Sequence, residues 1–233
     1  MTQPLRLVSI ADASHGGTKT SYPQEGLAVL LLEDHVHEAR LDKHGQVHQS
    51  DTHHLGGPCH TLLLQSNKSK RISHSTCHAE TNAGYKVNQS AQFIAMRWTE
   101  LLRSTDKQHK ASDMMSVFDS SSYEIRIDHC TDCMDFWQLC CGIKGVPSDK
   151  NSRLAVLSMR EERLSGRIRH FMHLPTEAII VDGLTKSGLF KLLMQHLTTG
   201  RWSLDNLKKP ITIRTVTTPR SEYDEKDLID LQG

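Results

Sequence analysis

The chain has 233 residues, with 28 Lys and Arg against 27 Asp and Glu and a formal net charge of +1. Hydrophobic residues make up 37% of it and the mean hydropathy is −0.47, which favours a soluble protein with a lean core. No apolar run approaches the roughly 18 residues of a membrane span, and no signal-peptide pattern opens the chain, so we expect no membrane partner. Six cysteines without secretory features favour reduced thiols in an intracellular protein, cytoplasmic or nuclear.

Basic residues gather in two segments. Residues 61–110 hold eight Lys and Arg against three Asp and Glu, and residues 167–215 again hold eight against three. The remaining segments are each net acidic. Two interpretations stay open: basic surfaces beside an acidic centre, as enzymes acting on nucleic acids require, or ordinary surface variation.

Five segments have the composition of strands. They are Leu5–Ala11, Gly26–Leu32, Thr61–Gln65, Tyr123–His129 and Ile168–Leu174. The first ends in Asp12, and the fourth is followed by Thr131-Asp132. Residues 33–60 are rich in His and Gly with little periodicity and predict a loop or irregular hairpin, and the Ser-rich residues 104–122 predict a surface loop.

The first predicted helix is the longest. Ser75 or Thr76 can cap it, and its apolar stripe follows a helical period: Ala83, Val87, Ala91, Ile94, Trp98 and Leu101. A shorter helix through Phe136 and another over about 151–164 follow. A last helix begins at Pro175-Thr176, contains Asp182 and continues through Leu189 to Leu197.

The order of these elements is three strands, a helix, a strand, helices, a strand and a helix. It predicts an α/β fold with a mixed five-stranded sheet, in which three antiparallel strands precede parallel crossovers and helices cover both faces. We expect residues 1–205 to form this domain. Residues 206–233 lack a packed pattern and predict a peripheral or disordered acidic tail.

Four carboxylates stand at corresponding places in this scheme. One turn before Ala83 the stripe reaches Glu80, whose unpaired burial would cost several kcal/mol; a first-turn Glu stabilised by the helix dipole is the alternative. Asp12 and Asp132 emerge at one sheet edge if their strands are parallel neighbours, and Asp182 lies on the last helix. Four carboxylates there would repel one another unless cations neutralise them.

Carboxylate oxygens favour Mg²⁺ or Mn²⁺ over zinc. Two such ions can activate a water molecule and stabilise the leaving oxygen of a phosphodiester. The pattern therefore predicts a site for two Mg²⁺ ions, with Mn²⁺ as a substitute.

Longer motifs carry a resemblance to a known family. They are Val8-Ser9-Ile10-Ala11-Asp12-Ala13-Ser14, Ser73-His74-Ser75-Thr76-Cys77-His78-Ala79-Glu80, Thr131-Asp132, and Leu174-Pro175-Thr176-Glu177 through Asp182-Gly183-Leu184-Thr185-Lys186. In this order, over roughly residues 5–200, they resemble the ribonuclease H domain of copia-type retrotransposon polyproteins. The second and fourth blocks are the more specific.

The resemblance implies a ribonuclease H-like fold and metal-dependent hydrolysis of the RNA strand of RNA–DNA hybrids. It implies that Asp12, Glu80, Asp132 and Asp182 are the catalytic, metal-binding carboxylates. It also implies an upstream reverse transcriptase domain in a longer Pol polyprotein, since no Y-x-D-D motif occurs in this chain. Cys133 departs from the family, which commonly has Ser or another small polar residue after the Asp. The alternative is a decayed copy, a catalytically inactive nucleic-acid-binding or interaction module of the same fold.

Three further groups of residues each allow two interpretations, a binding role or a purely structural or solvated one. Cys130 and Cys133, with Cys140-Cys141 behind them, could bind zinc, but their spacing fits neither a ribbon nor a finger and favours buried thiols. The histidines of 33–60 lack convincing ligand spacing and favour solvated loop residues. The basic turn of Lys68, Lys70 and Arg71 either contacts nucleic-acid phosphates or is simply solvated.

Overall fold

The computed structural model describes residues 4–14, 22–70, 73, 75–103, 115, 123–186 and 190–215. Their seven strands form one sheet in the order β6-β3-β2-β1-β4-β5-β7. The strands are β1 Leu5–Ser14, β2 Gln24–Glu33, β3 Gly57–Lys68, β4 Arg126–Thr131, β5 Ile168–His173, β6 Arg201–Trp202 and β7 Thr212–Thr215.

The pairing of the strands follows the predicted mixed pattern. β1, β2 and β3 pair antiparallel, whereas β4 lies parallel to β1 and β5 parallel to β4. The two added strands are short and extend the edges, β6 beside β3 and β7 beside β5. The expected mixed sheet, in which three antiparallel strands precede parallel crossovers, is therefore confirmed, with seven strands in place of five.

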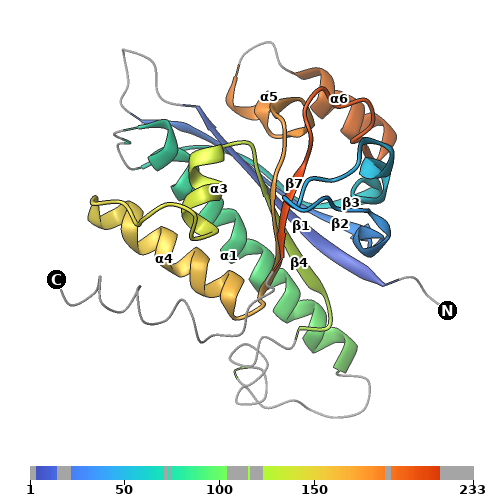
Figure 1. The fold of residues 1–233 in the computed structure, drawn as a ribbon, viewed down its shortest axis with the longest axis horizontal. Helices are drawn as coiled ribbons and strands as arrows, with labels where there is room; N and C mark the ends of the chain where they lie inside the picture. Colours follow the sequence, from blue (N-terminus) through green and yellow to red (C-terminus); the bar gives the residue numbers. More distant parts are fainter. Residues whose placement is uncertain are drawn as a thin grey trace.

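Helices cover both faces of the sheet (Figure 1). On one face lie α1 Thr76–Arg103, α3 Met134–Cys140 and α4 Lys150–Leu164, and on the other α5 Asp182–Thr185 and α6 Phe190–Thr199. Alternate residues of β1 point into two hydrophobic cores on opposite faces of the sheet. Leu7 and Ala11 pack with the alanine-rich face of α1. Val8 and Ile10 belong to the other core, with Ile179 to Val181 and Trp202. Burial on both faces explains the continuous apolar run in β2.

The long helix α1 begins at Thr76, and the Ser75 hydroxyl accepts a hydrogen bond from the His78 amide, as a helix cap does. Ala83, Val87 and Ala91 are fully buried, in agreement with the predicted stripe. Leu101 is 69% exposed, so the prediction of burial was wrong for the last position, because α1 extends past the sheet there.

The fourth strand and the last helix differ from the sequence predictions. The fourth strand begins at Arg126 rather than Tyr123, because Tyr123 and Ile125 pack under α1 before the ladder starts. The predicted last helix is instead three pieces: the short 3-10 helix η3 Thr176–Ala178, α5 and α6. Ile179, Ile180 and Val181 between them are all buried, and three consecutive buried side chains do not fit one amphipathic helix.

The segments predicted as loop and tail contain packed elements. Residues 33–60 include two 3-10 helices, η1 Val36–Glu38 and η2 Gln49–His54, and the start of β3. Packing continues past the expected boundary at residue 205, since Leu207, Ile211 and Ile213 are buried and β7 pairs with β5. Residues 216–233 and most of 104–122 lie outside the described residues. No described helix has the length and apolar character needed to cross a membrane.

Candidate metal centre

Strand register places two of the predicted carboxylates side by side. β1 and β4 are parallel neighbours in which Ile10 stands opposite Cys130. Asp12 and Asp132 each follow that pair by two residues, Asp12 within β1 and Asp132 just after the end of β4. The sequence analysis expected both residues at one edge of the sheet if β1 and β4 were parallel neighbours. The two strands are parallel neighbours in the structure.

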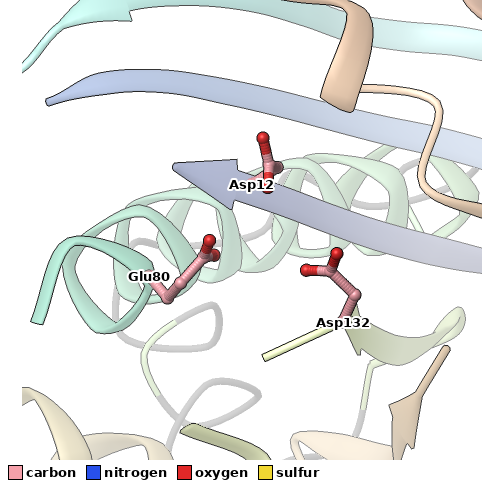
Figure 2. Close-up of side chains that lie close together, drawn as sticks. All are labelled: Asp12, Glu80 and Asp132. Carbon is pink, nitrogen blue, oxygen red and sulfur yellow. The ribbon is translucent and has the colours of Figure 1, made fainter. Parts of the chain in front are cut away.

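The third carboxylate comes from the helix layer. Glu80 lies in the second turn of α1, and its Oε1 accepts a hydrogen bond of 3.0 Å from the backbone N–H of Ala13. One carboxylate oxygen from each of Asp12, Glu80 and Asp132 lies within 4.8 Å of the other two. Figure 2 shows the side chains converging from a strand, a helix and a strand end. Asp12 is 1% and Glu80 3% exposed.

The surroundings of Glu80 and Asp12 disfavour their negative charges. Burial, together with the nearby charge of Asp12, raises the pKa of Glu80 well above its usual range. Burial also raises the pKa of Asp12, although the hydrogen bond from Thr185 and the charge of Lys186 offset part of this. A bound cation would reverse the balance by stabilising both carboxylates in their ionised form.

The donor set fits a hard divalent cation. All three side chains supply oxygen, which Mg²⁺ and Mn²⁺ prefer. Oε2 of Glu80 is buried and has no hydrogen-bond partner among the described residues. A buried carboxylate oxygen without a partner is costly, and coordination would satisfy it.

Asp182 stands next to this group but not within it. Its Oδ1 forms an ion pair with the Lys186 ammonium one helical turn later, and that ammonium lies 3.6 Å from Asp12 Oδ1. Asp182 is close enough for its charge to raise the pKa of Asp12. The structure thus brings three predicted ligands together and places a lysine between the first and the fourth.

Three side chains that contact the carboxylates were not among the predicted site residues. Thr185 Oγ1 donates to Asp12, and Thr176 Oγ1 donates to Asp132 Oδ2 at 2.8 Å. Lys186 and both threonines belong to the P-T-E and D-G-L-T-K motifs, so the motif was the available signal. The two histidines of β5 contact different aspartates. His173 Nε2 lies 3.2 Å from the carbonyl oxygen of Asp132, whereas His170 Nδ1 lies 2.9 Å from Asp128 Oδ1.

The predicted basic turn is described in part. Lys68 ends β3, and Lys70 follows it; Arg71 lies outside the described residues. Lys68 and Lys70 line a cavity of about 580 Å³ together with Lys86 and Asn82, which is two residues after Glu80. The charge of Lys86 is balanced by an ion pair with the buried Glu25 at 2.6 Å. The other two lysines that line the cavity are Lys68 and Lys70.

No family model matches the chain, and no curated protein matches it. Two solved structures are similar to it. A crystal structure of LC11-RNase H1 in complex with an RNA/DNA hybrid has 14% sequence identity, covers 77% of this chain and 93% of its own, and has a TM-score of 0.43. A structure of LC11-RNase H1 isolated from compost by a metagenomic approach has 13% identity, coverages of 82% and 99%, and a TM-score of 0.41. The strand order and pairing of this chain by themselves give its fold class, an α/β fold with a mixed sheet.

Proposed function

We propose that this chain is a metal-dependent endonuclease that hydrolyses the RNA strand of RNA–DNA hybrids. The observation that carries the proposal is the convergence of Asp12, Glu80 and Asp132 at the end of two parallel strands, with one buried Glu80 oxygen left unpartnered. The motif resemblance supports an origin in a copia-type retrotransposon Pol polyprotein, with a reverse transcriptase domain upstream. Oxygen donors alone do not specify a substrate, so the substrate class rests on that resemblance.

Some residues of the site would bind the metal, and others orient the metal-binding carboxylates. Asp12, Glu80 and Asp132 would hold Mg²⁺, which when bound supplies Lewis-acid activation of a phosphodiester and of the attacking water. The Ala13 amide orients Glu80, while the hydroxyls of Thr185 and Thr176 orient Asp12 and Asp132. These bonds hold the carboxylates in place before substrate arrives.

Recognition of the hybrid uses its backbone rather than its base sequence. Lys68 and Lys70, which line one cavity with Asn82 and Lys86, are suited to contact phosphates. The 2′-hydroxyl groups of the RNA strand would distinguish it from DNA.

The test is cleavage of a labelled RNA–DNA hybrid, beside DNA and RNA duplexes of the same sequence, with Mg²⁺, with Mn²⁺ and with EDTA. We expect cut RNA only from the hybrid and only with metal. Asp12→Asn should lower single-turnover cleavage by at least about a hundredfold, while Asp205→Asn, which changes an exposed aspartate after β6, should match the wild type. Hybrid binding without cleavage would instead support the inactive nucleic-acid-binding module.

A further inference from the structure

Three cavities adjoin one another along α1. The first, of about 580 Å³, lies between α1, the start of β2 and the end of β3. The second, of about 560 Å³, is lined by α1 and the same two strands. The third, of about 370 Å³, lies between α1 and α4. Gln89 lines all three, so a chain-like ligand can extend from one cavity to the next.

The first cavity carries positive charge. Lys68, Lys70 and Lys86 line it, together with one carboxylate among the described residues, that of Glu25. Glu25 is 1% exposed, and its two oxygens accept hydrogen bonds of 2.8 and 2.6 Å from the Lys86 ammonium. No carboxylate of a described residue forms an ion pair with Lys68 or Lys70. Two positive charges therefore remain for an anionic ligand such as a phosphate group.

Aromatic rings lie beside these charges. Tyr85 lines the first and the third cavity, and Phe93, which is 56% exposed, lines the second and the third. The ring of Tyr22, itself 40% exposed, has its centroid 5.5 Å from the Lys68 ammonium. Accessible rings next to cationic groups are the arrangement on which unpaired nucleobases stack.

The third cavity offers hydrogen-bonding groups in place of cations. Asn88, Gln89 and Gln92 line it, and the carboxylate of Glu162, at the same cavity, forms an ion pair with Arg167. Asn88 is 1% exposed, and neither its Nδ2 nor its Oδ1 has a hydrogen-bond partner among the described residues. A carboxamide presents a donor beside an acceptor, which matches the edge of a nucleobase. This cavity is therefore suited to a base and the first one to a phosphate.

We propose that these three cavities bind single-stranded nucleic acid, with phosphates at Lys68 and Lys70 and unpaired bases against Tyr85 and Phe93. Cationic groups and stacking rings on one groove are the means by which proteins hold single strands with little sequence preference. Paired bases in a duplex stack on one another and hide their faces, so a duplex cannot use these rings. None of the three carboxylates of the metal centre lines these cavities, so the binding goes beyond the proposed cleavage and needs no metal.

The experiment measures fluorescence anisotropy of a labelled single strand of about 15 nucleotides, in EDTA, as DNA and as RNA of the same sequence. We expect saturable binding of the single strand, about tenfold tighter than that of the corresponding DNA duplex. The DNA and RNA strands show which of the two the cavities prefer. No saturable binding of either strand, or equal affinity for the duplex, would overturn the proposal.

Variants locate the binding on this surface. Phe93→Ala and Tyr85→Ala should each weaken single-strand binding by about tenfold and leave duplex binding unchanged, because each removes a stacking ring. Tyr85→Phe, which keeps the ring, should retain most of the affinity. Leu101→Ala, at a 69% exposed position near the end of α1, is the matched control. Wild-type affinity in both alanine variants would place the binding elsewhere and refute the assignment.

The salt dependence tests the phosphate contacts. Lys68→Gln and Lys70→Gln should each reduce the slope of log affinity against log salt concentration by about 0.7 for a single strand. Lys191→Gln, at an exposed position of α6 on the opposite face of the sheet, should leave the slope unchanged. Unchanged slopes in both cavity variants would contradict the phosphate contacts. Because all these measurements use metal-free protein, a failure of the proposed cleavage would not alter their results.

Discussion

The ammonium group of Lys186 lies 3.6 Å from Asp12 Oδ1 and at the same time forms an ion pair with Asp182. The lysine thus holds a positive charge beside the buried Asp12 when no cation is bound. It also separates Asp12 from Asp182, the fourth of the predicted metal-binding carboxylates. In this structure a divalent cation that used both Asp12 and Asp182 would have to displace it.

Removal of this ammonium should strengthen cation binding. Lys186 is partly exposed, so solvent screens its repulsion of a nearby ion, and we expect Lys186→Met to bind Mn²⁺ about tenfold more tightly. Lys191→Met, at an exposed position of α6, is the matched control and should not change the affinity. Calorimetric titration at fixed ionic strength measures both. Weaker binding in Lys186→Met would mean that the lysine supports the site instead of competing for it.

Asp12→Asn should leave the metal-free fold as stable as the wild type or make it more stable. The pKa of Asp12 is raised in the folded state, so the folded protein binds more protons than the unfolded chain just above the usual aspartate pKa. Its contribution to stability is therefore lost as pH rises toward neutrality, and the asparagine variant avoids this loss. Urea unfolding at pH 5 and pH 8 with EDTA measures the effect. A marked loss of stability at pH 8 would show that Asp12 is a structural residue held by Thr185.

Asp128 is the buried aspartate for which we expect the opposite result. It is fully buried, pairs with Arg6 at 2.8 Å and with Arg169 at 2.9 Å, and lies within reach of His170. Burial alone would raise its pKa, but His170 and the two arginines hold it well below the usual range. Asp128→Ala leaves the buried Arg6 without its partner and should cost about 3–5 kcal/mol of unfolding free energy. Asp205→Ala is the control, and a loss below 1 kcal/mol for Asp128→Ala would contradict the prediction.

His129 should make the fold sensitive to acid. Its ring is fully buried, with Nδ1 2.8 Å from Ser9 Oγ, and burial lowers its pKa to about 3. Between pH 6.5 and 3 the unfolded chain binds the proton and the folded protein does not, so stability falls as pH falls, by on the order of 4 kcal/mol. In His129→Gln this part of the pH dependence should disappear, whereas the exposed His37→Gln should keep it. Equal slopes in all three proteins would refute the assignment.

Gly84 leaves room for an aromatic ring. A Cβ at this position of α1 would lie 2.6 Å from Cζ of Phe136, so this fully buried ring or the helix would have to shift. Gly84→Ala should therefore lower the unfolding free energy by about 1–3 kcal/mol, although alanine favours helix formation. Gly145→Ala, where no atom lies within 4 Å of the added Cβ, should be nearly neutral. Thermal unfolding of both variants tests the contact.

Local patterns in the sequence determined the elements and part of the site. The stripe of α1 and its Ser75 cap depend on neighbours one turn apart, and the apolar run of β2 reflects burial on both faces, so both are visible in a short window. The order of strands and helices was enough to predict the mixed sheet, because parallel neighbours need crossovers. Asp12, Glu80 and Asp132 could be selected because each stands where a predicted element begins or ends.

Only the tertiary structure decided which of these groups meet. The contact of Lys186 with Asp12 and the hydrogen bond from the Ala13 amide to Glu80 each join residues from separate elements. The buried network of Arg6, Asp128 and Arg169 also depends on strand register across three strands. β7 was not predicted because its four residues carry no strand pattern of their own. They form a strand only by pairing with β5. Distances between such groups follow from pairing and packing of the whole chain, and no local window contains that information.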